Sequence, residues 1–113
     1  MKKKFLPAFK GVIDGFHDAG ILIQYVLGVC AMIAGFILKL STTEWILFII
    51  CIGMVISTEI LNTCIERLCD LYTEEEDERI RKIKDMAAGA VLISSAAAGF
   101  SALIILLNHL WKG

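Results

Sequence analysis

The sequence lacks the patterns that mark several common classes of protein. None of its four cysteines forms a C-x-x-C spacing, so neither a disulfide framework nor a structural zinc site is predicted. It has no G-x-x-x-x-G-K-[ST] loop, which excludes a P-loop cradle for phosphates. No internal repeat, low-complexity segment or linker divides the 113 residues, so we expect one domain over residues 1–113.

A cleavable signal peptide is not expected either, although the chain begins with basic residues and soon reaches an apolar run. Polar and charged side chains separate the two, and no A-x-A cleavage site follows. These side chains are Lys10, Asp14, His17 and Asp18. We therefore expect the first apolar run to be retained.

Apolar residues, by contrast, are present in excess. They make up 58% of the chain, and the mean hydropathy of +0.75 is higher than a soluble domain of this size needs. Three long runs explain it, at residues 21–40, 45–66 and 87–111. Each is near the ~20 residues that span a hydrocarbon core of roughly 30 Å. We therefore predict an all-α membrane protein with three transmembrane helices; the alternative is a buried helical bundle.

The basic residues predict the orientation of these helices. One group precedes the first run, another separates the second from the third, and only Lys39 and Lys112 lie on the other side. The two groups are Lys2, Lys3, Lys4 and Lys10, and then Arg67, Arg79, Arg81, Lys82 and Lys84. By the positive-inside rule both groups are cytoplasmic. The sequence therefore predicts a cytoplasmic N-terminus and an external C-terminus.

Residues 5–18 mix apolar and polar side chains at roughly helical spacing. The apolar members are Phe5, Phe9, Val12, Ile13 and Phe16, and the polar ones are Lys10, Asp14, His17 and Asp18. Such a pattern is typical of an amphipathic helix that lies in the membrane surface. We expect one here, on the cytoplasmic side.

Four polar side chains lie near the end of the second run: Glu59, Asn62, Glu66 and Asp70. At ~100° per residue around a helix, the last three lie about −60°, −20° and +20° from the first. They therefore form one narrow line, which we call the polar stripe. The opposite face carries isoleucine, leucine and cysteine.

Glu59 is the most informative member of the polar stripe, because it lies several residues inside the predicted span. An ionised carboxylate costs about 2.5–3.5 kcal/mol at the centre of a membrane helix, and such residues are usually functional. The deeper carboxylate can act as a base while a shallower one holds a metal ion. Two alternatives stay open. Glu59 and Asn62 could instead bond neighbouring helices, and Glu66 and Asp70 could be ordinary interfacial charges.

Lys84 and Asp85 stand at the start of the third run, close to the level where the polar stripe leaves the membrane. They therefore place a cation and an anion near the point where the polar stripe leaves the membrane. A nucleotide phosphate held by magnesium would find partners there. For Lys84 alone, contact with lipid head groups is an equally good explanation.

The polar stripe resembles the signature of the small prokaryotic diacylglycerol kinases and undecaprenol kinases. That signature, E-x-L-N-[ST]-x-I-E-x-x-x-D, is filled completely at residues 59–70, which read EILNTCIERLCD. A second block of the family, K-D-x-[AG]-[AS]-[AG]-A-V-L-[IV], resembles KDMAAGAVLI at residues 84–93. Chain length, three spans and an N-terminal surface helix extend the resemblance over the whole chain.

The resemblance implies a homotrimer in the bacterial cytoplasmic membrane, with active sites at subunit boundaries. It also implies transfer of the γ-phosphoryl group from MgATP to a lipid alcohol, with ATP and Mg²⁺ as cofactors and no nucleic-acid partner. By it, Glu59 is similar to the general base and Asn62 to a residue that positions the reacting groups. Glu66 resembles a magnesium ligand, and Lys84 and Asp85 resemble residues that contact the nucleotide.

One segment departs from the family pattern. Members commonly carry E-x-N-x-R-[IF]-[HQE] before the first span, whereas residues 18–24 here read DAGILIQ. Asp18 would replace a glutamate that serves as the second magnesium ligand, with Asp14, one turn earlier, as the alternative. Gly20 and Leu22 stand in place of the asparagine and arginine. We expect these changes to bear on the second carboxylate and hence on nucleotide affinity.

Two other functions stay open. A carboxylate inside a span can also be a relay in an ion- or proton-coupled transporter subunit, although the polar stripe runs to one side rather than across the bilayer. The changes at Gly20 and Leu22 would also suit a catalytically inactive relative. Undecaprenol and diacylglycerol both fit as acceptor, because apolar pockets discriminate weakly between similar tails. Residues 87–90 look slightly more like those of undecaprenol kinases.

Overall fold

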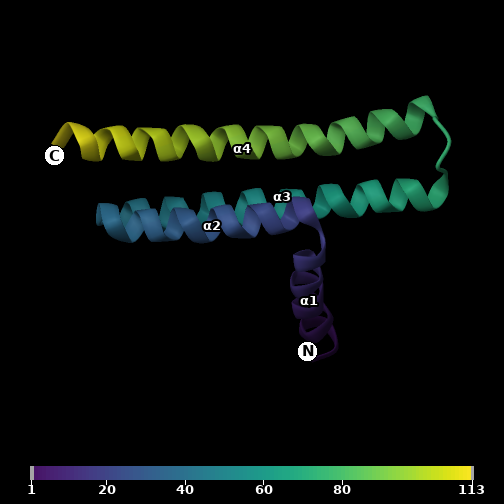
Figure 1. Cartoon of the computed structure of the whole chain (residues 1–113), viewed down its shortest axis with the longest axis horizontal. Coiled ribbons are helices and arrows are strands. Elements are labelled where there is room, and N and C mark those ends of the chain that lie inside the picture. The colour runs from purple at the N-terminus through teal and green to yellow at the C-terminus, as the bar shows by residue number, and fades with distance from the viewer. Residues whose placement is uncertain (1, 113) are drawn as a thin grey trace.

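The computed structural model describes residues 2–112, with side chains from residue 5 onward. This part of the chain is helical, with short connections: α1 (Lys2–Asp14), the 3-10 turn η1 (Gly15–His17), α2 (Ala19–Leu38), α3 (Thr42–Tyr72) and α4 (Glu78–Lys112). Helices α2, α3 and α4 run along the long axis, and α1 leaves them at a steep angle (Figure 1). The side chains of the three lysines at positions 2–4, used above for orientation, lie outside the described part.

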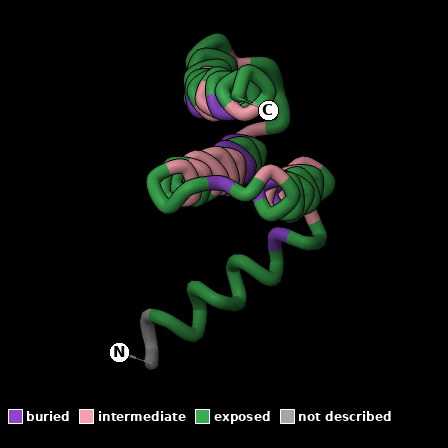
Figure 2. The backbone as a smooth tube through the Cα atoms, turned by 90° about the vertical axis from the view of Figure 1, so that its left-hand side faces the viewer, coloured by how far each residue is buried: buried purple, intermediate pink, exposed green. Residues whose placement is uncertain are grey.

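The prediction of three helices able to cross a membrane is confirmed. Helices α2, α3 and α4 have 20, 31 and 35 residues, and each is long and apolar enough to span a bilayer. Few of their residues are buried within the chain, and Figure 2 shows exposed positions over most of their surface. Because much of that surface is apolar, lipid or another protein surface is its natural environment.

Helix α3 lies between the other two long helices and contacts both. Gly28 of α2 is buried, and a β-carbon there would come within 3.1 Å of Ile52 Cγ2 of α3. On the other side, Thr58 Oγ1 and Ser94 Oγ lie 2.8 Å apart and join α3 to α4 by a hydrogen bond. Small and hydroxyl side chains thus let the helices approach closely, as membrane helices do.

The turn between α2 and α3 is fixed by a capping box. The Glu44 N–H donates to Ser41 Oγ at 3.2 Å, and the Ser41 N–H donates to Glu44 Oε1 at 2.9 Å. His109, near the end of α4, places its Nε2 atom 3.0 Å from the same Oε1 atom. One carboxylate therefore ties the start of α3 to the end of α4.

The N-terminal helix is shorter at its C-terminal end than the expected range of 5–18, because α1 ends at Asp14 and a 3-10 turn follows. The chain then restarts as α2, whose first turn is capped by Asp18: its Oδ1 atom accepts from the Ile21 N–H at 3.0 Å. The Tyr25 hydroxyl donates to the Val12 carbonyl at 2.7 Å. This bond ties α1 back to α2 across the break.

Helix α3 continues to Tyr72, past the expected end of the second span at residue 66. The acidic run that follows lies mostly in the loop before α4, where the Asp77 carboxylate accepts from the Arg79 N–H at 2.9 Å. The Arg79 guanidinium also pairs with Asp77 at 3.3 Å. These bonds from Arg79 hold the pKa of the Asp77 carboxyl below its usual value.

Candidate functional site

The whole polar stripe lies on α3, because that helix is unbroken from Thr42 to Tyr72. Within it, the Asn62 Nδ2 atom donates to Glu66 Oε1 at 3.1 Å, the contact expected of residues one turn apart. Asn62 is only 8% exposed. Its Oδ1 atom has no hydrogen-bond partner among the described residues, which is uncommon for a buried oxygen.

Glu59 lies against the start of α2. A β-carbon added to Gly20 would come 2.9 Å from Glu59 Oε1 and 3.3 Å from Asp18 Oδ1. The structure therefore brings two predicted site carboxylates, Glu59 and Asp18, together beside Gly20 from two segments of the chain. Glu66 lies two turns from Glu59 on α3 and contacts Asn62 instead.

Both carboxylate oxygens of Asp18 are engaged. Oδ1 caps α2 through the Ile21 N–H, and Oδ2 accepts from Arg67 Nη2 at 3.3 Å. Sequence reasoning assigned Arg67 only to the group of basic residues that orients the chain. Its position directly after Glu66 was the one signal that it borders the site.

Lys84 and Asp85 occupy different surroundings, although they are neighbours in the sequence. The Lys84 Nζ atom donates to Asp70 Oδ1 at 2.7 Å, so Lys84 lies at the last member of the polar stripe. Asp85 is exposed and makes no side-chain hydrogen bond or ion pair within the described part. Asp14, the alternative to Asp18, is exposed at the end of α1, whereas Asp18 lies beside Glu59.

The carboxylates fit a magnesium ion that arrives with phosphates better than a permanent metal centre. Among the described residues, no three histidine, cysteine, aspartate or glutamate side chains are grouped closely enough to hold a metal by themselves. Magnesium usually keeps several waters and binds one or two carboxylates together with substrate phosphates. Asp18 and Glu66 can supply such ligands.

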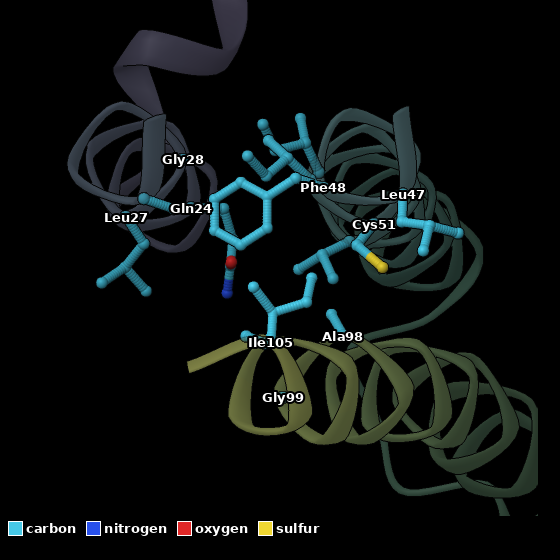
Figure 3. A pocket seen from close by; sticks show the side chains of 14 residues that line it. Gln24, Leu27, Gly28, Leu47, Phe48, Cys51, Ala98, Gly99 and Ile105 are labelled. Carbon is cyan, nitrogen blue, oxygen red and sulfur yellow. The ribbon is translucent and has the colours of Figure 1, made fainter. Parts of the chain in front are cut away.

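An apolar groove of about 410 Å³ opens between α2, α3 and α4. Its lining is hydrophobic apart from the amide of Gln24, whose side chain extends into the groove alongside the ring of Phe48 (Figure 3). Val55 and Ile56 of the lining lie one turn before Glu59 on α3, and Gln24 lies one turn after Gly20 on α2. The groove therefore begins one helical turn from the Glu59 carboxylate.

Comparison with known proteins agrees with the resemblance seen in the sequence. The family model described as prokaryotic diacylglycerol kinase matches residues 7–106. The undecaprenol kinase of Bacillus subtilis (strain 168) is 33% identical over 109 residues, which cover 96% of this chain and 89% of that protein. The matched region contains the polar stripe, Asp18 and Lys84. The chain is thus a lipid kinase that belongs to the prokaryotic diacylglycerol kinase family.

Proposed function

We propose that this protein transfers the γ-phosphoryl group of MgATP to the hydroxyl group of a membrane lipid alcohol, with undecaprenol as the preferred acceptor. The observation that carries this proposal is the approach of Glu59 and Asp18 beside Gly20, one helical turn from an apolar groove, with Glu66 two turns further along the polar stripe. The preference for undecaprenol rests on the activity of the Bacillus relative.

Glu59 acts as the general base in this proposal. It is half-buried, and it lies closer to the apolar groove than the other carboxylates of the polar stripe. A base must lie within hydrogen-bond reach of the proton it removes, and the lipid hydroxyl comes from the membrane side. Glu59 therefore takes the proton of that hydroxyl as the hydroxyl oxygen attacks the γ-phosphorus, and ADP leaves as the bond from this phosphorus to the β,γ-bridging oxygen breaks.

Phosphoryl transfer needs mainly positioning and neutralisation of charge. Glu66 and Asp18 would hold the magnesium ion, which neutralises charge on the phosphates when it is bound. Asn62 positions Glu66 through the hydrogen bond from its Nδ2 atom. Lys84 contacts the nucleotide at the end of the polar stripe where Asp70 lies, and the exposed Asp85, next to it in the sequence, is the second nucleotide contact.

The apolar groove holds part of the hydrocarbon chain of the acceptor. A lipid whose hydroxyl lies at Glu59 can lay its chain along Val55 and Ile56 without leaving an apolar environment. A groove of about 410 Å³ suits one flexible chain, and hydrocarbon tails are recognised there by burial rather than by hydrogen bonds.

The enzyme works as a homotrimer in the bacterial cytoplasmic membrane, with the N-terminus in the cytoplasm and the C-terminus outside. The large apolar surfaces that α2, α3 and α4 leave exposed support helix packing between copies of the chain. Helix α1, set at an angle to the bundle (Figure 1) and carrying exposed Phe5 and Phe9, lies in the inner surface of that membrane.

The test uses purified full-length protein in mixed micelles that contain either undecaprenol or diacylglycerol. We expect magnesium-dependent ATP consumption, labelled phosphate appearing in the lipid, and a higher kcat/KM for undecaprenol. Glu59→Gln should lower kcat by at least ~100-fold, the scale of general-base catalysis, and still bind MgATP. Failure of both lipids to stimulate turnover would contradict the proposal.

A further inference from the structure

The pair between Asp18 and Arg67 lies at the candidate site, yet no catalytic role proposed above uses its arginine. Arg67 Nη2 lies 3.3 Å from Asp18 Oδ2, and the two side chains are 66% and 23% exposed. The Asp18 oxygen that Arg67 occupies is the one left free by the cap on α2, since Oδ1 already accepts from Ile21. A metal ion bound at Asp18 would compete with Arg67 for that oxygen.

The charges around the polar stripe make this competition important. Asp18, Glu59, Glu66 and Asp70 carry negative charge, and the cations that contact them in the described part, Arg67 and Lys84, are each paired with a carboxylate. A triphosphate would meet a region with excess negative charge and no unpaired cation of this set. Like charges repel. The nucleotide can therefore bind only if paired cations leave their carboxylates and become available to its phosphates.

We propose that Asp18 and Arg67 form a latch that MgATP binding opens. Arg67 leaves Asp18 Oδ2 for an oxygen of the nucleotide phosphates, and the same carboxylate oxygen becomes free for magnesium. Arg67 is then a phosphate-binding residue in the loaded enzyme and a neutralising partner of Asp18 in the empty one. This inference rests on the proposed kinase function and adds a residue to it.

The chemistry of Arg67 suits this exchange. An exposed ion pair contributes little to stability, so it opens readily. The planar guanidinium binds phosphate oxygens through paired N–H donors, which a lysine cannot reproduce. Arg67 also follows Glu66 directly on α3, so a phosphate next to a metal held by Glu66 comes close to it.

The competing explanation is that the pair is only a structural tie between the start of α2 and α3. A structural tie and a latch predict different changes in nucleotide affinity for two variants. In Asp18→Asn the cap on α2 is kept, because asparagine is an equally good capping residue, but Arg67 is released. In Arg67→Gln the helix propensity is kept, but the phosphate-binding group is lost.

The experiment is calorimetric titration of full-length detergent-solubilised protein with two probes, ATP in EDTA and the magnesium complex of the β,γ-imido analogue of ATP. Arg67→Gln should bind both probes at least about tenfold more weakly. Asp18→Asn should bind metal-free ATP severalfold more tightly but the magnesium complex more weakly. Arg67→Lys should recover part of the lost affinity.

Arg79→Gln is the matched control, because Arg79 forms a similar pair with Asp77, in the loop before α4, with 3.3 Å between the paired atoms. It should bind both probes as the wild type does. The latch is overturned if Arg67→Gln binds both probes as this control does. It is also overturned if Asp18→Asn and Arg67→Gln weaken the binding of metal-free ATP to the same extent. If the wild type binds neither probe, the kinase function falls too. If wild-type turnover is normal and Arg67→Gln binds both probes as tightly as the wild type does, only the latch falls.

Discussion

The Glu59 carboxylate of α3 lies directly against Gly20 at the start of α2. A β-carbon on Gly20 would lie 2.9 Å from Glu59 Oε1, closer than real β-carbons come to their neighbours. The carboxylate occupies this place because residue 20 has no side chain. Gly20 therefore leaves the space in which the proposed base lies.

Gly20→Ala should reduce phosphoryl transfer without unfolding the protein. The new methyl group meets only the ends of side chains, Glu59 Oε1 at 2.9 Å and Asp18 Oδ1 at 3.3 Å, so stability changes little, but a base moved by a fraction of an ångström is mispositioned. We expect kcat to fall roughly 10- to 100-fold, with a smaller change in the KM for MgATP because Asp18 is crowded less than Glu59. Steady-state kinetics with the lipid acceptor in excess provides the measurement.

Gly53→Ala serves as its control, because a β-carbon on Gly53 of α3 would meet nothing within 4 Å in this chain. That variant should keep the wild-type kcat. Equal activity of the two variants would mean that the contact with Gly20 does not position Glu59.

Ala98→Leu should weaken use of the lipid acceptor. Ala98 of α4 lines the apolar groove, and three extra carbon atoms would fill part of the space given to the acceptor chain. We expect the KM for the lipid to rise about tenfold, corresponding to about 1.4 kcal/mol, with no change in the KM for MgATP. Kinetics at varied lipid mole fraction in micelles would show it.

The neighbouring variant Ala97→Leu adds the same volume at an exposed position that does not line the groove. Its lipid KM should equal that of the wild type. A similar rise in both variants would assign the effect to helix packing instead of acceptor binding.

Asn62→Leu should separate stability from activity. The substitution removes a buried Oδ1 atom that has no partner in the described part of the chain, and an unsatisfied buried group costs roughly 1–3 kcal/mol. The variant should be at least as heat-stable as the wild type. It should also bind MgATP more weakly, because Glu66 loses the donor that holds its Oε1 atom. A lower melting temperature would indicate that Asn62 is mainly structural.

Ser41→Ala should do the reverse and change stability alone. Loss of the side-chain cap on α3 removes the hydrogen bond from the Glu44 N–H and costs about 1 kcal/mol of the free energy of unfolding. The site lies at the other end of α3, so kcat and both KM values should stay at wild-type levels. Thermal unfolding in detergent, compared with kinetics at low temperature, tests both halves of this expectation.

The sequence predicted what depends on local periodicity. Apolar runs predicted the three long helices, and helical spacing placed Asn62 one turn from Glu66, which the structure shows in hydrogen-bond contact. Whether these residues perform the predicted chemistry stays a prediction.

The remaining features depend on how helices cross. Arg67 and Asp18 are 49 residues apart in the sequence, and nothing in either segment alone indicates that they pair. The same holds for Gly20, whose effect is visible only once Glu59 is placed beside it. The break after Asp14 also went unpredicted, because the amphipathic pattern continues through it.

Helix α3 has 31 residues in one piece, which at 1.5 Å per residue is ~46 Å, well beyond the ~30 Å thickness of a hydrocarbon core. We expect a helix of this length to cross the boundary between the hydrocarbon core and water, with Glu59 on the membrane side of that boundary and Asp70 on the water side. The lipid substrate can then react without leaving the membrane, and the nucleotide can react without entering it. The length of α3 alone sets the distance between the two binding regions.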